Sequence, residues 1–111
     1  MATIVSFGGA AARRAVLTAE LDRLVPVLRA LPGVAEAWVF GSAAGGQVHA
    51  TSDLDLFVVR VTDEPVSERA VTLLRELTPR VPVDLFVYTP DEAAAGGRFV
   101  RSVRATGRRL R

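Results

Sequence analysis

The sequence predicts a single α/β domain in which a small sheet of about three strands is covered by helices. Three observations support this fold class. Apolar segments with strand character alternate with segments of helical periodicity, glycine and proline separate them, and 111 residues provide for one hydrophobic core. The pattern leaves open whether the strands pair in a parallel or a mixed sheet. We therefore expect one domain over residues 1–111.

The first helix is expected over about residues 11–31, where apolar side chains recur at helical spacing. Pro26 lies inside this range and removes one backbone hydrogen bond, so we expect a kink or two short helices that meet near Val25. Pro32 and Gly33 then end the helix and turn the chain.

Three strands are expected over residues 35–40, 53–61 and 81–88, which are rich in β-branched and aromatic side chains. A second helix is expected after residue 64, because Pro65 suits the first helical position. Its inner stripe would consist of Val66, Ala70, Leu73, Leu74 and Leu77.

The C-terminal quarter of the chain carries helix start and stop signals. Residues 89–92, Thr-Pro-Asp-Glu, form a capping-box pattern with proline at the first helical position. Gly96 and Gly97 would loosen this helix, which resumes over about residues 98–105. Gly107 is the expected helix stop, and the last residues are expected to form a short edge strand.

The composition limits the kinds of partner and compartment. All 14 basic residues are arginine, the net charge is +2, and residues 98–111 hold six arginines without an acid. Because Phe99 is the sole aromatic residue there, we interpret this tail as a solvated charged face and expect no direct nucleic-acid binding. The chain has no cysteine, no secretory signal and no apolar run of the roughly 20 residues that span a bilayer, so we expect a cytoplasmic protein without a membrane segment.

Acidic residues interrupt two of the expected strands. Asp53 and Asp55 open the second strand and share one of its faces, because successive strand side chains alternate. Asp84 lies within the third strand, on the face opposite to Val83 and Leu85. Converging carboxylates repel and raise one another's pKa, and a charge in an apolar strand is costly without compensation. A bound Mg²⁺ would compensate them, and its usual company is a nucleotide.

A candidate phosphate site follows the first strand. Gly41 lets the backbone approach a ligand closely, and Ser42 offers a hydroxyl and a backbone N–H. If residues 43–46 open a helical turn, its free N–H groups would add to an anion site. Each feature also has an ordinary structural interpretation: Gly-Ser pairs fill loops, Asp84 could pair with an arginine, and His49 fits a solvated loop. The functional interpretation therefore depends on the combination.

Residues 41–56, GSAAGGQVHATSDLDL, resemble the signature of the minimal nucleotidyltransferases, the smallest members of the polymerase β nucleotidyltransferase superfamily. That signature is Gly-Ser, ten residues, Asp-x-Asp and a third aspartate on a later strand, and the resemblance covers most of the chain. It implies the nucleotidyltransferase fold, a small mixed sheet flanked by helices. It also implies transfer of a nucleoside monophosphate from a nucleoside triphosphate to an acceptor hydroxyl.

Roles for individual residues follow from the resemblance. It implies that Asp53 and Asp55 hold two magnesium ions, and that Asp84 completes the metal site and helps to deprotonate the acceptor. Gly41 and Ser42 would bind the triphosphate of ATP. Many relatives carry an arginine shortly after Gly-Ser, where this chain has Ala-Ala-Gly-Gly. Either a distant arginine substitutes for it, or nucleotide binding is weak.

The resemblance also implies a partner. Small members of this family commonly serve as the antitoxin of a two-gene module, in which they bind and adenylylate a helical HEPN-type toxin. We therefore expect a Mg²⁺-dependent transferase that moves AMP from ATP to a hydroxyl of such a partner. Two alternatives are a catalytically weak module that neutralises its partner sterically, and a small-molecule transferase of the antibiotic-modifying kind. The latter would require a second subunit, which a homo-oligomer could supply.

Overall fold

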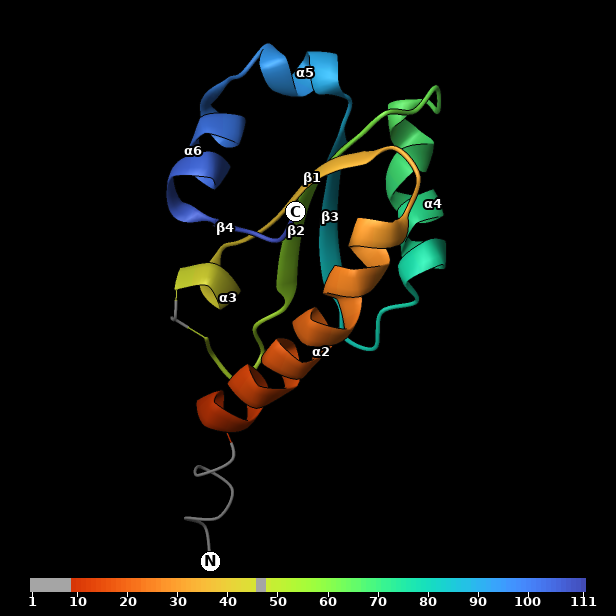
Figure 1. The fold of residues 1–111 in the computed structure, drawn as a ribbon. Helices are drawn as coiled ribbons and strands as arrows, with labels where there is room; N and C mark the ends of the chain where they lie inside the picture. Colours follow the sequence, from red (N-terminus) through yellow and green to blue (C-terminus); the bar gives the residue numbers. More distant parts are fainter. Residues whose placement is uncertain (1–8, 46–47) are drawn as a thin grey trace, which may run out of the picture.

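The computed structural model describes residues 9–45 and 48–111 (Figure 1). Its helices and strands follow in the order α2 (Ala10–Ala30), β1 (Val34–Phe40), α3 (Ser42–Gly45), β2 (Leu54–Arg60), α4 (Val66–Leu77), β3 (Val83–Tyr88), α5 (Pro90–Ala94), α6 (Arg98–Thr106) and β4 (Arg108–Arg109). The alternation of helices and strands confirms the predicted fold class. The predictions for residues 1–8 and for Gly46 lie outside the described residues.

The strands form one mixed sheet of four strands in the order β3-β2-β1-β4. β1 runs antiparallel to both β2 and β4, whereas β2 and β3 are parallel. A parallel pair needs a crossover connection, and α4 provides it. The fourth strand is the short C-terminal edge strand expected from the sequence. The mixed pairing, which the sequence pattern left open, agrees with the fold that the resemblance implies.

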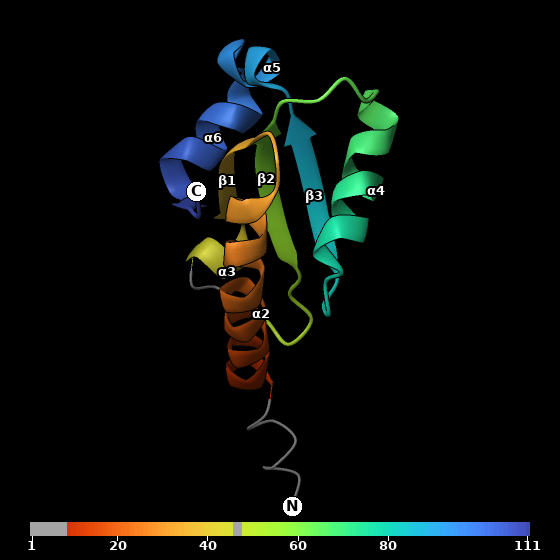
Figure 2. The same ribbon diagram turned by 45° about the vertical axis from the view of Figure 1, so that its right-hand side comes forward.

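One face of the sheet, here called the aliphatic face, packs against α2 and α4 (Figure 2). Alternate strand residues supply it, with Leu54, Leu56 and Val58 of β2 completely buried. The helices contribute leucines such as Leu24 and Leu73. This face forms the larger of the two hydrophobic clusters among the described residues. Burial of these apolar side chains stabilises the fold.

The other face, here called the aromatic face, carries the intervening strand residues and packs against α5 and α6 (Figure 1). Phe57 is fully buried there, and Trp38 and Phe40 pack against the same cluster. Phe99 of α6 lies edge-on to Phe57, with ring centroids 5.9 Å apart. Phe40 and Phe99 form a similar contact at 5.4 Å. The aromatic residues of β1 are therefore packing residues.

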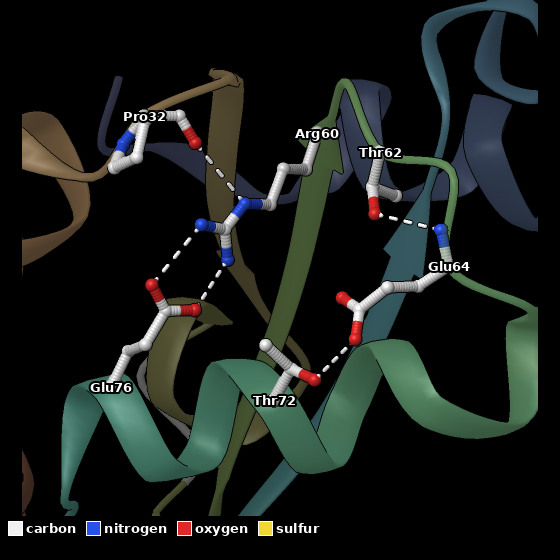
Figure 3. A network of polar contacts seen from close by, with 6 residues as sticks. All are labelled: Pro32, Arg60, Thr62, Glu64, Thr72 and Glu76. Carbon is white, nitrogen blue, oxygen red and sulfur yellow. Dashed lines mark hydrogen bonds and ion pairs between the residues drawn. The ribbon is translucent and has the colours of Figure 1, made fainter.

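The far end of β2 is held in place by Arg60 (Figure 3). Its guanidinium makes two hydrogen bonds to the carboxylate of Glu76 on α4, at 2.6 and 3.1 Å. Its Nε donates to the carbonyl of Pro32, just before β1. A bidentate arginine–carboxylate pair fixes orientation as well as distance. This network secures α4 and the β1 start at the end of β2 that is remote from Asp55.

Two predictions about the helices are corrected in part. α2 continues through Pro26 to Ala30 and does not divide into two helices. Pro26 has no N–H to donate to the carbonyl of Asp22, one turn earlier. Both residues lie on the exposed side of the helix, where water can bind that carbonyl. Pro65 is the residue before α4 and not its first residue. Val66 is 69% exposed and does not belong to the inner stripe.

Arg69 of α4 is buried, which was not expected for a charged residue. Its Nε donates to the carbonyl of Glu64, and its Nη1 lies 2.7 Å from the carboxylate of Glu92 on α5. Glu92 also accepts from the backbone N–H of Thr89, whose hydroxyl accepts from the N–H of Glu92. The predicted capping box is thus confirmed, and an arginine connects it to α4.

The predicted glycine signals at the end of the chain are also confirmed. Gly96 and Gly97 adopt positive φ angles of 76° and 106° between α5 and α6. Gly107 follows α6 directly, and a Cβ atom there would lie within 3.0 Å of the carbonyl oxygen of Val39. The absent side chain lets the chain pass close to β1 before β4 begins.

None of the helices within residues 9–45 and 48–111 combines the length and apolar character needed to span a bilayer.

Candidate active site

The register of the sheet brings two of the predicted site aspartates together. Asp55 of β2 and Asp84 of β3 are direct partners in the parallel pair. Their side chains share the aromatic face because both lie in register with Phe57 and Phe86, two residues further along each strand. Asp55 is half-buried and Asp84 is exposed. Two carboxyl groups therefore meet where the aromatic face opens to solvent.

The environment of Asp55 opposes its ionisation. Burial raises the pKa of the Asp55 carboxyl above its ordinary value, and the charge of Asp84, a hydrogen bond shared with Asp84 and the charge of Asp53 raise it further. Each of these effects disfavours the ionised form. A bound cation, like a proton, would relieve the repulsion between these carboxyl groups. The expected convergence of Asp84 with the second-strand aspartates is thus observed for Asp55.

Gly41 lies against the Asp55 carboxylate. Its φ angle of +69° lies in the left-handed region, where residues with a side chain are strained. A Cβ atom at this position would also collide with Oδ2 of Asp55. Glycine is therefore favoured here for two reasons, and both follow from the position of Gly41 against Asp55. The close approach of Gly41 to a ligand stays a prediction.

Ser42 begins α3, a single helical turn that ends at Gly45. The helical turn expected after Gly-Ser is thus confirmed within the described residues. The backbone N–H groups of Ala44 and Gly45 both donate to the carbonyl of Gly41, at 3.2 and 3.1 Å. These two groups are engaged within the turn and are not free for an anion. Anion binding by the remaining N–H groups of this turn and by Ser42 stays a prediction.

Asp53 has a different neighbour, Arg13 of α2. The Nη2 atom of Arg13 lies 3.7 Å from Oδ1 of Asp53, and its Nε donates to the backbone carbonyl of Ser52 at 2.7 Å. Ser52 closes a tight turn, because its hydroxyl accepts from the N–H of His49 and its own N–H donates to the His49 carbonyl. His49 itself is exposed, as expected for a solvated loop.

Arg13 is a neighbour of the predicted site aspartates that sequence reasoning did not single out. It precedes Asp53 by 40 positions on a predicted helix, and nothing in its spacing distinguishes it from the other arginines. The one available signal was the missing arginine after Gly-Ser. That gap left two possibilities, a substitute arginine from elsewhere in the chain or weak nucleotide binding, and it did not point to Arg13.

The donor set suits a hard cation. Within residues 9–45 and 48–111, no three acidic or histidine side chains stand close enough together to enclose a metal ion. Asp55 and Asp84 adjoin each other, and Asp53 pairs with Arg13 nearby. Magnesium commonly binds through one or two carboxylates and completes its coordination with water and phosphate oxygens. The adjacent, mutually repelling pair therefore fits Mg²⁺ binding together with a phosphate ligand.

Comparison with known proteins agrees with this geometry. A family model described as a nucleotidyltransferase domain matches residues 21–106. A crystal structure from Sulfolobus solfataricus, provisionally assigned as a nucleotidyltransferase, aligns with a TM-score of 0.57 and 26% identity over 78% of this chain and 79% of its own. A chain of a toxin–antitoxin structure with AMP-PNP aligns with a TM-score of 0.50 and 22% identity over 82% of this chain and 72% of its own, which indicates a shared fold. No curated protein matches the chain significantly.

Proposed function

The chain belongs to the nucleotidyltransferase domain family, and on that basis we propose that it transfers AMP from ATP to a hydroxyl group of a partner protein. The partner we propose is a helical HEPN-type toxin, which the chain would restrain as an antitoxin in the cytoplasm. The observation that carries the chemistry is the pairing of Asp55 with Asp84: burial and the neighbouring carboxyl raise the pKa of Asp55, and Gly41, where a side chain would be strained, lies against its carboxylate.

Each site residue has a proposed task. Asp55 and Asp84 would hold Mg²⁺, which when bound would neutralise negative charge on the phosphates of ATP. Asp53, which the resemblance also assigned to the metal, lies beside Arg13 at the edge of this pair. Gly41 and Ser42 would lie along the triphosphate. Asp84 would accept the proton of the acceptor hydroxyl. The hydroxyl oxygen forms a bond to the α-phosphorus of ATP, the bond from that phosphorus to the β-phosphate oxygen breaks, and pyrophosphate leaves.

The acceptor is proposed to be a protein because of where Asp84 lies. β3 is an edge strand of the sheet, and Asp84 is exposed on it. An acceptor hydroxyl can therefore approach this carboxylate from outside the chain. The toxin–antitoxin structure that shares the fold contains AMP-PNP, an analogue of ATP, and this supports ATP as the donor and a toxin as the acceptor.

A labelling assay tests the proposal directly. The protein is incubated with its candidate toxin, MgCl₂ and ATP labelled at the α-phosphate. Label should appear on the toxin with wild-type protein and be lost with Asp55→Asn or Asp84→Asn. Asp63→Asn is the matched control, because Asp63 is an exposed aspartate beyond the opposite end of β2. Absence of label with a verified binding partner and magnesium would refute adenylylation.

A second candidate function is favoured by α3. Residues 42–45 contain no basic side chain, and two of their N–H groups are already engaged within the turn. If nucleotide binding is correspondingly weak, the chain would neutralise its partner by covering it. In that case Asp55→Asn should still protect cells that express the toxin. Failure of this variant to protect while it still binds the toxin would exclude the steric account.

A further inference from the structure

We propose that Arg13 is the nucleotide-binding cation of this site, a residue of α2 that contacts the triphosphate in place of the arginine that the segment after Gly-Ser lacks. This inference rests on the proposed function, because it assumes that the site binds ATP. It concerns a residue outside the stretch 21–106 that matches the family model. Arg13 belongs to the second turn of α2 and reaches the start of β2 from there.

The guanidinium of Arg13 is anchored at one atom only. Its Nε donates to the Ser52 carbonyl at 2.7 Å, which is an ordinary hydrogen-bond length. A guanidinium has five N–H donors in a fixed fork, so this bond orients the group and leaves its two terminal nitrogens for other acceptors. The anchor also places them at the residue that precedes Asp53. Arg13 is thus held beside the acidic group by a bond that a ligand would not have to break.

The contact with Asp53 is loose enough to be exchanged. The distance of 3.7 Å between Nη2 and Oδ1 exceeds that of a hydrogen bond. The side chains of Arg13 and Asp53 are 21% and 45% exposed, so water screens the attraction between them. Such pairs contribute little to stability. A phosphate group offers a guanidinium two acceptor oxygens in a matching geometry, and it can therefore replace the carboxylate as the partner of Arg13.

The charges of the site favour a basic side chain beside the phosphates. Asp53, Asp55 and Asp84 are acidic, and α3 contributes no basic side chain. A triphosphate that enters this site brings further negative charge. Of the ion pairs found within residues 9–45 and 48–111, the pair between Arg13 and Asp53 is the one that involves a predicted site residue. Arg13 is therefore in position both to hold Asp53 before ATP binds and to contact a phosphate afterwards.

A purely structural role for Arg13 has a natural control in the same helix. Arg29, at the other end of α2, also donates through Nε to a backbone carbonyl, that of Leu110, at 3.0 Å. If Arg13 only connects α2 to the loop before β2, Arg13→Gln and Arg29→Gln should lower the unfolding temperature by similar amounts. Both variants should then bind nucleotide equally well. If Arg13 contacts phosphate, only its replacement should weaken the binding of ATP.

Calorimetric titration with ATP and with AMP in the presence of Mg²⁺ tests the proposal on wild type, Arg13→Gln, Arg13→Lys and Arg29→Gln. We expect Arg13→Gln to weaken ATP binding by about tenfold or more, since a charge-assisted contact is lost, and to weaken AMP binding less. Arg13→Lys should recover part of the ATP affinity, and Arg29→Gln should bind like wild type. The lysine variant keeps the test decisive if the glutamine variant folds poorly, because it retains the charge and loses the fork.

The outcomes separate the two proposals. ATP binding by Arg13→Gln and Arg13→Lys within twofold of wild type would overturn the role of Arg13 and leave the proposed function standing. An equal loss of affinity for ATP and AMP, or an equal loss in Arg29→Gln, would also overturn it, because it would indicate a structural effect. No ATP binding by the wild-type protein with Mg²⁺ would overturn both proposals.

Discussion

The two faces of the sheet are supplied by the same strands and have opposite character. Along β2, Leu54, Leu56 and Val58 point into the aliphatic face and are completely buried. Asp55 and Phe57 alternate with them and point to the aromatic face, which ends in the acidic pair. The comparison shows how one strand serves two purposes. Leu54, Leu56 and Val58 stabilise the fold, whereas Asp55 is repelled by neighbouring carboxyl groups and the fold does not relieve this repulsion.

The acids of the molecule divide in the same way. Arg60 lowers the pKa of Glu76, and Arg23 lowers the pKa of Glu20, each through a hydrogen bond. The backbone N–H of Thr89 and then Arg69 lower the pKa of Glu92. By contrast, burial and the neighbouring carboxyls raise the pKa of Asp55. A carboxyl held beside other carboxyls is characteristic of functional sites, whereas the paired acids are structural.

The largest difference between the faces should appear on truncation of a side chain. Leu56→Ala leaves a cavity in the aliphatic face and should lower the free energy of unfolding by about 2–5 kcal/mol. Phe86→Ala removes a ring on the aromatic face that is 40% exposed, and it should cost only about 1–2 kcal/mol. Urea unfolding measures both values. Equal losses would show that the aromatic face near Asp84 is as tightly packed as the aliphatic one.

The next effect concerns the turn that meets Asp55. Gly41→Ala forces a side chain into a left-handed conformation and against the Asp55 carboxylate, so it should cost roughly 1–3 kcal/mol of stability. It should also weaken the binding of ATP with Mg²⁺, because the carboxylate is displaced. Gly45→Ala is the matched control, since a Cβ atom there meets nothing within 4 Å. A Gly41→Ala protein with wild-type stability would contradict the described close approach.

A smaller effect is expected from pH. Hydrogen bonds from Arg23 and from the backbone of Arg80 lower the folded-state pKa of Glu20 below 4.5, so its contribution to stability is present above that pH and is lost as the pH falls further. Asp55 has the opposite sign in the metal-free protein: its folded-state pKa lies above 3.8, so protonation there favours the folded state.

Urea unfolding between neutral and acidic pH separates these contributions. Glu20→Gln should reduce the loss of stability in acid, and Asp55→Asn should remove the opposing contribution and make the loss steeper. Asp63→Asn, on an exposed loop, is expected to follow the wild-type profile. An acid transition in Glu20→Gln that equals the wild-type one would mean that the buried carboxylate is not held by Arg23 as described.

Local signals in the sequence were sufficient for much of this architecture. The capping box at Thr89, the stop at Gly107 and the strand alternation that sets Asp84 opposite Val83 depend on residues within a few positions of each other, and all three are observed. The positions that differed depend on distant partners. Arg69 can be buried because it pairs with Glu92, which is 23 positions later in the sequence. α2 tolerates Pro26 because Pro26 lies on the side of the helix that faces solvent.

The candidate site shows the same limit. The spacing of Gly41, Asp55 and Asp84 indicated a shared location, because strand order and alternation bring them to one end of one face. The contact from Arg13 to Asp53 could not be read from the sequence, since it depends on where the first helix crosses the start of β2. Nor could the pattern show that two of the N–H groups of α3, those of Ala44 and Gly45, are engaged with Gly41.

The central claim is that Asp55 and Asp84 are kept together for a cation that accompanies a nucleotide, and thermal unfolding of wild type and Asp55→Asn tests it most directly. In EDTA, Asp55→Asn should unfold at a higher temperature than wild type, because the variant lacks the buried charge and the repulsion that raise the pKa of Asp55. With Mg²⁺ and a non-hydrolysable ATP analogue, wild type should gain stability while Asp55→Asn gains little. A wild-type protein that is the more stable one in EDTA, or an equal gain for both proteins, would contradict the claim.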